Sequence, residues 1–277
     1  MIKNCLLPVA GFGTRFFPVT KVIPKEMLPV LTKPLIQYAI EEAIEAKIYS
    51  FSLVTNKYKE SIKSYFKPHE EIENLLKKSS KNFLLNDLNS IMDLAEFKYI
   101  LQDEMLGLGH AIKIGNSIID TSPFAVILPD DLCVNLDGKS VLSQMVELHE
   151  KYPEYCIVGI EEVPITQVSS YGVIDGQVID NNGLIYSVKN MVEKPNIEDA
   201  PTNLAIIGRY ILTREIFDVL EITTEGKNGE IQITDALMEL AKKGKVLAYK
   251  FQGVRFDCGT VDGYIKANNF FLRNSSI

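Results

Sequence analysis

Short apolar runs alternate with amphipathic segments along the first half of the chain. Residues 5–9 predict a buried strand, and residues 34–46 place apolar side chains at the spacing of one helix face. Residues 51–55 and 97–101 predict two further strands. Residues 124–128 are apolar throughout, which is typical of a strand covered on both faces of a parallel sheet. The alternation predicts an α/β fold with a Rossmann-like, mostly parallel sheet flanked by helices.

The pattern changes in the second half of the chain. A helix is predicted over 141–152 and an apolar strand over 155–160. Beyond them, short runs of alternating apolar and polar residues are interrupted by Gly172, Gly176 and the Asn-Asn-Gly sequence at 181–183. Such interruptions are typical of antiparallel hairpins. The sheet is therefore expected to be mixed, with a small β lobe.

The last third of the chain returns to alternating strands and helices. Strands are predicted over 203–210 and 246–251, and helices over 214–220 and 233–240, the second with Thr234 as its cap. A final amphipathic helix follows. No hexapeptide repeat is present, so no C-terminal β-helix is expected.

Residues 58–96 interrupt this series with a polar segment of helical character. Leucines such as Leu75 and Leu85 recur among its charges. We interpret it as an inserted helical segment, and a solvated helical pair is favoured over a lid. Residues 1–277 are predicted to form a single domain that contains this insert.

A glycine-containing loop follows the first strand directly. It comprises Ala10, Gly11, Phe12, Gly13, Thr14 and Arg15. The glycines let backbone N–H groups approach an anion, and Arg15 and Lys25 add cations that can neutralise phosphate oxygens. The loop therefore predicts a polyphosphate ligand. It does not fit a dinucleotide-binding dehydrogenase, because Phe16 stands where a third glycine is needed, and the P-loop pattern is absent from the chain.

Two aspartates beside apolar strands are candidate metal ligands. Asp130 follows the strand at 124–128, and Asp257 precedes Gly259. A carboxylate at the end of a buried strand needs a partner, so a magnesium ion and a turn or N-cap role are equally compatible with the position of Asp130. If the two carboxylates meet at the carboxyl edge of the sheet, they could bind Mg²⁺ together with phosphate oxygens and water.

Composition narrows the class of protein. The 277 residues carry a net charge of -7, which argues against a nucleic-acid surface. No apolar stretch reaches the roughly 20 residues that a membrane span needs. The four cysteines and three histidines are scattered, which predicts reduced thiols and no zinc site. We expect a cytoplasmic enzyme with neither a nucleic-acid nor a membrane partner.

The glycine loop continues into a longer signature. Gly-x-Gly-Thr-Arg-x-x-Pro leads to Thr20-Lys21 and then to Pro-Lys-Glu-Met-Leu-Pro at 24–29. This run resembles the signature loop of the sugar-phosphate nucleotidylyltransferases, which make nucleotide-sugars. The resemblance covers nearly the whole chain and is strongest to the bacterial UTP–glucose-1-phosphate uridylyltransferase group. The matching segments are Gly-Leu-Gly-His-Ala at 107–111, Asn-Leu-Ala-Ile-Ile-Gly-Arg-Tyr-Ile-Leu at 203–212 and Glu-Ile-Gln-Ile-Thr-Asp-Ala-Leu at 230–237. Val9 is a small departure, because many members have alanine there.

The resemblance implies a role for each matching residue. Arg15 and Lys25 would be catalytic, and Asp130 and Asp257 would bind Mg²⁺. The residues implied to bind the nucleotide are Ala10, Gly11, Gly13, Thr14, Glu26, Gln102 and Gly107. The residues implied to bind the sugar phosphate are Gly172, Glu193 and Lys194. From composition alone, an adjacent acid and base before a proline would more often be a solvated strand edge.

The implied reaction joins UTP and glucose 1-phosphate to give UDP-glucose and pyrophosphate. A sugar-phosphate oxygen would attack the α-phosphorus in line, with Mg²⁺ assisting. A glucose-1-phosphate thymidylyltransferase is the second candidate, because such enzymes share the loop but usually lack an insert like residues 58–92. A noncatalytic nucleotide-sugar-binding paralogue is the third, although it would be expected to lack Arg15 or a metal carboxylate. We also expect a homo-oligomer, either a dimer or a tetramer.

Overall fold

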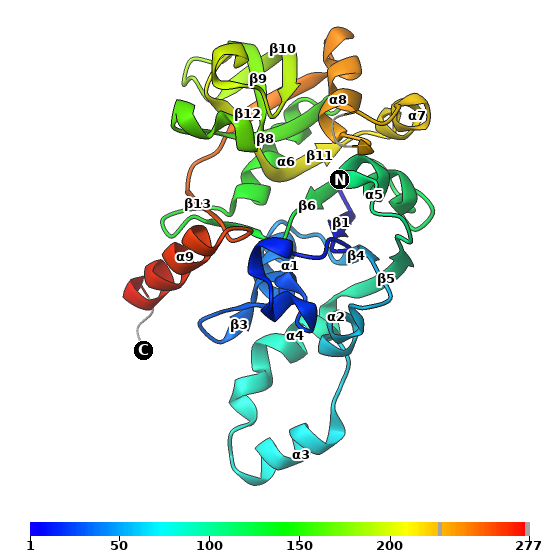
Figure 1. Cartoon of the computed structure of the whole chain (residues 1–277). Coiled ribbons are helices and arrows are strands. Elements are labelled where there is room, and N and C mark those ends of the chain that lie inside the picture. Colours follow the sequence, from blue (N-terminus) through cyan, green and yellow to red (C-terminus); the bar gives the residue numbers. More distant parts are fainter. Residues whose placement is uncertain (227–228, 275–277) are drawn as a thin grey trace.

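A nine-stranded sheet organises the part of the chain that the computed structural model describes, residues 1–226 and 229–274 (Figure 1). Its strands in spatial order are β5 (Glu96–Leu101), β4 (Ser50–Thr55), β1 (Asn4–Pro8), β6 (Phe124–Ile127), β11 (Leu204–Leu212), β8 (Cys156–Glu162), β12 (Val246–Lys250), β10 (Ile185–Glu193) and β9 (Gly172–Val178). Residues 227–228 and 275–277 of the predicted single domain lie outside the described residues.

The sheet is mixed, and its parallel pairs gather in the N-terminal half. β5, β4, β1 and β6 pair in parallel, as the alternation of strands and helices predicts. β11 then runs antiparallel to both β6 and β8, and only the pair of β8 with β12 is parallel among the described strands that follow. The β9–β10 hairpin confirms the predicted antiparallel turn region. It continues the main sheet and also pairs with β11.

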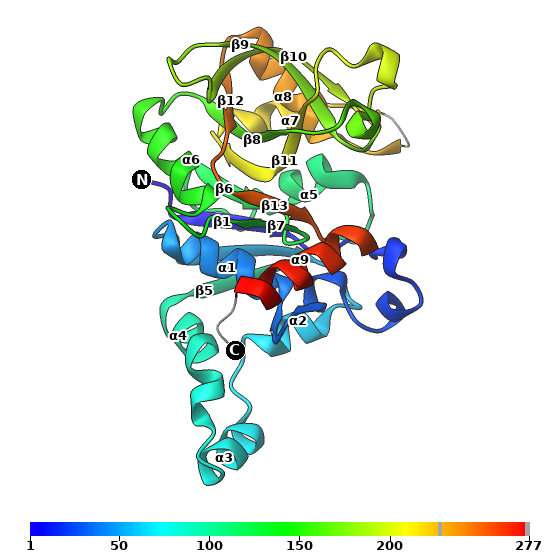
Figure 2. The same ribbon diagram turned by 90° about the vertical axis from the view of Figure 1, so that its left-hand side faces the viewer.

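Helices cover both faces of the sheet (Figure 2). One layer contains α5 (Gly107–Gly115), α7 (Glu215–Ile222) and α8 (Ile233–Lys242), and the other is dominated by α1 (Leu35–Glu45) and α6 (Val141–Lys151). Successive strand residues point to opposite layers: Leu6 packs in the first core, whereas Cys5 and Leu7 pack in the second. This two-sided burial explains why the central strands are apolar at every position.

The inserted segment lies between β4 and β5. It contains α2 (Glu60–Tyr65), α3 (Glu70–Lys78), the short helix η4 (Asn82–Leu85) and α4 (Asn86–Leu94). α2 and α4 are anchored by the buried side chains of Ile62 and Ile91, whereas α3 has no buried residue. Both views show α3 at the far end of an arm that extends away from the sheet (Figures 1 and 2).

A second, two-stranded ladder was not predicted from the sequence. β7 (Asp131–Val134) pairs antiparallel with β13 (Val254–Asp257), with Asp131 opposite Asp257. The C-terminal helix α9 (Val261–Asn274) follows β13. This ladder brings the chain that follows β6 beside the chain that follows β12. The remaining short elements are β2 (Pro29–Val30), β3 (Lys33–Pro34), η1 (Thr14–Phe16), η2 (Val19–Lys21), η3 (Lys25–Met27), η5 (Ile165–Ser170) and η6 (Ile197–Asp199).

Candidate active site

The glycine loop leaves β1 at the carboxyl edge of the parallel half of the sheet, where ligands of such sheets bind. Gly13 has φ +64, in the left-handed region, and a Cβ there would lie 3.0 Å from Cβ of Lys25. The Thr20 hydroxyl donates to the Gly13 carbonyl oxygen at 2.8 Å. A Cβ at Gly11 would meet no atom within 4 Å, so a ligand can approach the backbone at this residue.

Two adjoining cavities along this edge share Asp130. The predicted site residues that line the first are Ala10, Gly11, Lys25, Gln102, Gly107 and Asp130. Those that line the second are Arg15, Asp130, Gly172, Glu193, Lys194 and Asp257. Gly13, Thr14 and Glu26 line neither cavity. The residues assigned to the nucleotide and those assigned to the sugar phosphate thus line different cavities, which meet where Asp130, Glu230, Leu108 and Leu128 line both.

Lys25 and Asp130 form an ion pair at this junction, with Nζ 2.6 Å from Oδ2. Burial disfavours the Asp130 carboxylate, but Lys25 outweighs burial and holds the pKa of Asp130 below its ordinary value. Burial also opposes the charge on Lys25, yet Asp130 and Glu26 together raise the pKa of Lys25. Both groups are therefore charged near neutral pH.

Asp130, Asp257 and Arg15 converge on Gly259. The position that a Cβ of Gly259 would take lies 3.0 Å from Oδ2 of Asp130 and 3.0 Å from Oδ1 of Asp257. The two carboxylate oxygens can therefore be no more than twice that distance apart. Nη1 of Arg15 lies 3.5 Å from the same position. The absence of a side chain at Gly259 keeps the space between the two carboxylates open.

This pair of carboxylates fits a magnesium ion better than a metal that needs a complete protein cage. Among the described residues, no group of three or more histidine, cysteine, aspartate and glutamate side chains could hold a metal ion. Magnesium typically takes one or two carboxylates and fills its other positions with water and phosphate oxygens. Burial and the neighbouring Asp131 raise the pKa of Asp257, and Arg255 only partly offsets them. A cation beside Asp257 would stabilise its carboxylate and counteract the rise in its pKa.

Arg255 holds the β7–β13 ladder in place, and no sequence prediction identified it. Its guanidinium lies 2.5 Å from Oδ1 of Asp131 and 2.6 Å from Oε1 of Glu161, and 4.0 Å from Oδ2 of Asp257. It also lies over the Tyr171 ring, 4.9 Å from the centroid, and the Tyr171 hydroxyl donates to Asp257 at 3.3 Å. The only sequence feature that could have indicated a role for Arg255 is its position two residues before Asp257, a candidate metal ligand.

A second buried arginine supports the turn that carries Asp130. Arg209 is 1% exposed and forms an ion pair with Glu42 of α1 at 2.7 Å. Its Nη1 donates to the carbonyl oxygens of Leu128 and Gly208, at 3.4 Å and 3.0 Å. The residues before Asp130 are therefore fixed from inside the sheet.

The sugar-side residues are held by contacts among themselves. The Thr234 hydroxyl donates to Oε2 of Glu193 at 2.6 Å, so the prediction that Thr234 caps a helix is wrong; α8 begins at Ile233 and has no side-chain cap. A Cβ at Gly172 would lie 3.1 Å from each of these two oxygens. Lys194 has φ +47, and its backbone N–H donates to the Tyr171 carbonyl at 2.9 Å. Glu193 and Lys194 therefore sit at a constrained corner, unlike an ordinary strand edge.

On the nucleotide side, the buried Gln102 directly follows β5. Its Nε2 lies 3.1 Å from Nδ1 of His110, and its backbone N–H donates to the Thr55 carbonyl at 2.8 Å. Gly107 has φ +91, and a Cβ there would lie 2.8 Å from Cβ of Glu230. The helix that begins at Gly107 thus starts in a conformation that favours glycine.

Glu26 lies in a different setting from the one that the resemblance implies. Its side chain is fully buried, and both carboxylate oxygens accept from Nζ of Lys59, at 2.7 Å and 2.9 Å. Lys59 precedes α2 in the insert, so this ion pair joins the signature loop to the insert. In this geometry the carboxylate is already satisfied, and a nucleotide contact by Glu26 remains a prediction.

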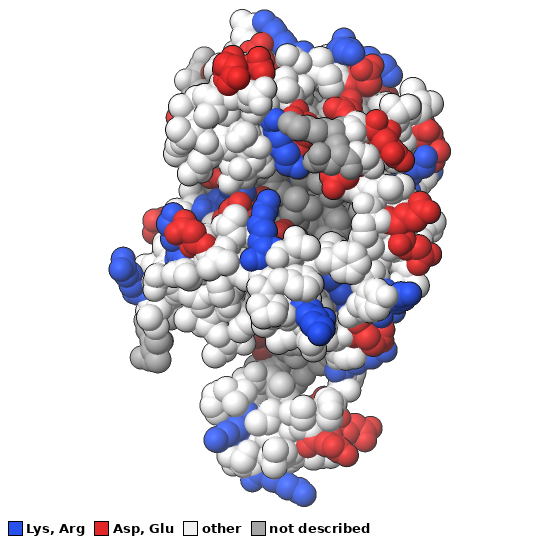
Figure 3. All heavy atoms as spheres, in the orientation of Figure 1, with Lys and Arg blue, Asp and Glu red and all other residues white. Residues whose placement is uncertain are grey.

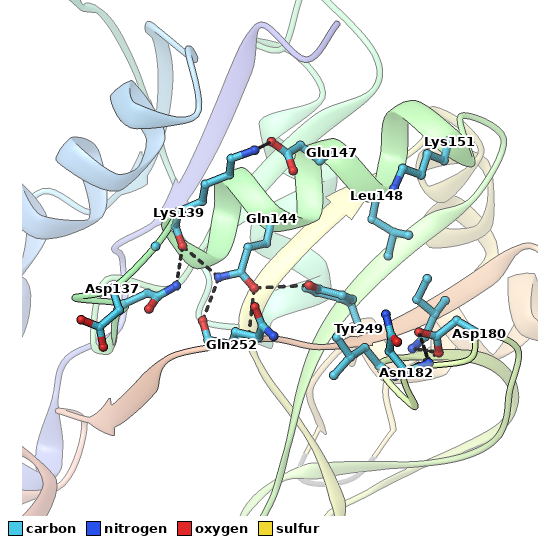
Figure 4. Close-up of a pocket in the computed structure, with 14 residues that line it drawn as sticks. Asp137, Lys139, Gln144, Glu147, Leu148, Lys151, Asp180, Asn182, Tyr249 and Gln252 are labelled. Atoms are coloured by element: carbon cyan, nitrogen blue, oxygen red, sulfur yellow. Dashed lines mark hydrogen bonds and ion pairs between the residues drawn. The ribbon is translucent and has the colours of Figure 1, made fainter.

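A separate cavity lies between α6 and the turn of the β9–β10 hairpin (Figure 4). Gln144 is hydrogen-bonded to two other residues that line this cavity: its Oε1 accepts from the Gln252 backbone N–H at 2.9 Å and from the Tyr249 hydroxyl at 3.3 Å. Gln144 also donates to the Gln252 carbonyl at 2.7 Å. The contacts fix the segment that leads into β13 and hence to Asp257.

The four cysteines are free, as predicted, and within the described parts of the chain no helix has the length and apolar character needed to cross a bilayer. Comparison with known proteins finds relatives that match nearly the whole chain. A UTP–glucose-1-phosphate uridylyltransferase from Pseudomonas aeruginosa is 54% identical over 274 residues, which cover 99% of this chain and 97% of the relative.

Two solved structures are similar over nearly their whole length. A UDP-glucose pyrophosphorylase complexed with UDP-glucose is 51% identical, with TM-score 0.90 and coverage of 99% of this chain and 100% of that chain. A UTP-bound UGPase from Acinetobacter baumannii is 38% identical, with TM-score 0.90 and coverage of 100% and 95%. The model of the nucleotidyl transferase family matches residues 5–274. The chain therefore belongs to the nucleotidyl transferase family.

Proposed function

We propose that the protein transfers the uridylyl group of UTP to glucose 1-phosphate, giving UDP-glucose and pyrophosphate. One observation carries the proposal: two cavities, one lined by Gln102 and the other by Lys194, meet at Asp130. Such a junction suits the transfer of a phosphoryl-linked group between two bound substrates. The Pseudomonas aeruginosa relative bears the name of this reaction, and the two solved structures hold UDP-glucose and UTP.

In the proposed reaction, a phosphate oxygen of glucose 1-phosphate attacks the α-phosphorus of UTP. A phosphorus–oxygen bond forms there, and the bond to the oxygen that bridges the α- and β-phosphates breaks, so that its electron pair leaves with pyrophosphate. No general base is needed, because a phosphate monoester with a second pKa of about 6 is largely ionised near neutrality. The chain contributes positioning and positive charge, from Arg15 and Lys25.

Asp130 and Asp257 would hold Mg²⁺. When bound there, the ion would neutralise the phosphate oxygens and withdraw charge from the α-phosphorus. The carboxylates would hold and orient it, and Arg255 fixes β13 through its ion pair with Asp131, the residue opposite Asp257 in the β7–β13 ladder. This assignment rests on the convergence of the two carboxylates at Gly259.

The remaining assignments follow the division of the cavities. Gln102 and Gly107 contact the base. On the other side, Glu193 accepts hydrogen bonds from sugar hydroxyls, and Lys194 contacts the sugar phosphate. The proposal includes the glycine loop as the cradle of the triphosphate. A cytoplasmic location and a homo-oligomeric state, dimer or tetramer, also remain proposals.

Incubation of the purified protein with UTP, glucose 1-phosphate and MgCl₂ tests the reaction. We expect pyrophosphate and UDP-glucose to appear in equal amounts, and neither to appear when one substrate is left out. Faster turnover with dTTP would favour a thymidylyltransferase. Binding of UDP-glucose without any pyrophosphate release would instead indicate a noncatalytic paralogue.

A further inference from the structure

The positive charge of the candidate active site does not distinguish one nucleoside triphosphate from another. Arg15 and Lys25 line the two cavities, and Figure 3 shows lysine and arginine side chains beside the hollow between the upper and middle parts of the molecule. These cations attract UTP and CTP alike, because the two ligands carry the same charge. Discrimination between them therefore depends on uncharged groups that reach the base, and the Gln102 amide, which lines the first cavity, is such a group.

The Gln102 amide is held by its nitrogen. Nε2 lies 3.1 Å from Nδ1 of His110 and makes a longer contact, at 3.5 Å, with the Gly107 carbonyl oxygen. Exchanging the two ends of the amide would set its oxygen against that carbonyl oxygen, which is unfavourable. Among the described residues, Oε1 of Gln102 has no hydrogen-bond donor. Oε1 is therefore the atom of this amide that a ligand can use.

His110 lies in the first turns of α5, and its Nδ1 has two possible partners. Nδ1 lies 3.1 Å from Nε2 of Gln102 and 3.1 Å from the Glu104 carbonyl oxygen. It can accept from the first or donate to the second, but not both. The Glu104 carbonyl already accepts from the Leu106 backbone N–H at 3.0 Å, whereas Nε2 of Gln102 otherwise has only its longer contact with Gly107. The arrangement that pairs more groups has the His110 proton on Nε2 and leaves Nδ1 to accept from Gln102.

We propose that His110 is a positioning residue for base specificity, because its Nδ1 holds the Gln102 amide with Oε1 available to the base. His110 lines neither cavity and acts only through Gln102. Oε1 accepts from the N3–H group of uracil, whereas cytosine carries a lone pair on N3 and would oppose it. An amide free to turn over would present Nε2 to cytosine and admit CTP. Thymine has the same N3–H group as uracil, so this device excludes CTP but not dTTP. The inference rests on the proposed use of UTP.

Calorimetric binding of UTP and of CTP, with MgCl₂ and without glucose 1-phosphate, tests the proposal. The wild type should bind UTP at least about 100-fold more tightly than CTP. His110→Leu, which has no acceptor, should lower this ratio about tenfold, the equivalent of one hydrogen bond. His110→Asn, whose Oδ1 can take the place of Nδ1, should keep the ratio within about threefold of the wild type. The matched control is Lys113→Ala, which removes an ion pair between α5 and Glu221 of α7 and should leave the ratio unchanged.

A purely structural role for His110 predicts a different pattern. Equal weakening of UTP and CTP in His110→Leu, an unchanged ratio, or a His110→Asn variant that discriminates no better than His110→Leu would overturn the proposal. Thermal unfolding shows which variants are folded, and His110→Ala replaces His110→Leu if the latter is not. In a Gln102→Ala background, His110→Leu should not change the ratio further, and a further fall would overturn the proposal.

Addition of glucose 1-phosphate to the same samples reports separately on the reaction. Selective UTP binding without pyrophosphate release would overturn the proposed reaction and support the role of His110. Pyrophosphate release with equal use of UTP and CTP by the wild type would overturn the role of His110 and leave the reaction standing.

Discussion

Among single residues, Arg15 has the most specific geometry for its predicted role. It is exposed on η1, yet Nη1 lies beside the point where Asp130 and Asp257 converge. Arg15→Ala should lower turnover roughly 100- to 1,000-fold, because it removes a cation at the charge that develops in the transition state. The unfolding temperature should barely change, since an exposed cation contributes little to folding. Pyrophosphate release and thermal unfolding of the same preparation check this, and unchanged turnover would remove Arg15 from the mechanism.

The buried pair of Glu26 and Lys59 gives a second prediction for single residues. Lys59→Met leaves a carboxylate unpaired in the interior and should lower the free energy of unfolding by about 3–5 kcal/mol. Combining it with Glu26→Gln should recover much of that loss. The control is Lys63→Met, which breaks a more open pair with Glu60 and should cost under about 1 kcal/mol. Urea denaturation measures all three.

A different result for these variants would support the nucleotide-binding role that the resemblance implies for Glu26. If Lys59→Met were neutral while Glu26→Gln weakened UTP binding without changing stability, the Glu26 carboxylate would be a nucleotide ligand. Local sequence cannot distinguish the two roles, because the partner of Glu26 lies 33 positions away in the insert. For the same reason the sequence did not indicate Arg255, whose partners Asp131 and Glu161 come from other strands.

At the scale of elements, the strands and helices of the main sheet were predictable because each is covered on defined sides. Residues 124–128 read as a buried strand since Phe124 and Val126 enter one core and Ala125 and Ile127 the other. The pairing of β7 with β13 was not predictable, because it depends on contacts between segments far apart in the chain. The antiparallel pairing of β11 with β6 was missed for a similar reason, since an apolar strand carries no signal of its direction.

The separation of the two cavities leads to a prediction for each side. Gln102→Ala should mainly reduce the discrimination among nucleotides, because Gln102 directly follows β5 and lines the first cavity. Lys194→Ala should mainly raise the Michaelis constant for glucose 1-phosphate, because Lys194 follows β10 beside the second. Initial rates with each substrate varied in turn separate the two effects. A Lys194→Ala variant that changed only the constant for UTP would contradict this division of the site.

At the scale of the whole molecule, folding and the proposed metal binding place opposite requirements on the Asp257 carboxylate. Burial and Asp131 raise its pKa in the folded chain, so its ionised form favours the unfolded state. The resulting cost is absent below the unfolded pKa of about 3.9 and grows as the pH rises through the raised value. At pH 7 without metal, Asp257→Asn should therefore unfold at the wild-type temperature or above it, and this gain should shrink as the pH falls toward 4.

Thermal unfolding with added Mg²⁺ completes this test. An ion that binds only the folded chain raises the unfolding temperature. Mg²⁺ should therefore stabilise the wild type but should not stabilise the Asp257→Asn variant. A large loss of stability in Asp257→Asn at pH 7 would show instead that the carboxylate is satisfied within the chain by Arg255 and Tyr171.

The Mg²⁺ dependence of pyrophosphate release tests the central claim most directly, that one ion shared by Asp130 and Asp257 serves both cavities. With UTP and glucose 1-phosphate present, a chelator should abolish release by the wild type, and excess Mg²⁺ should restore it. Asp130→Asn and Asp257→Asn should each lose most of the rate at any Mg²⁺ concentration while remaining folded. Release that persists in the chelator, or that either variant retains at the wild-type rate, would contradict the shared ion.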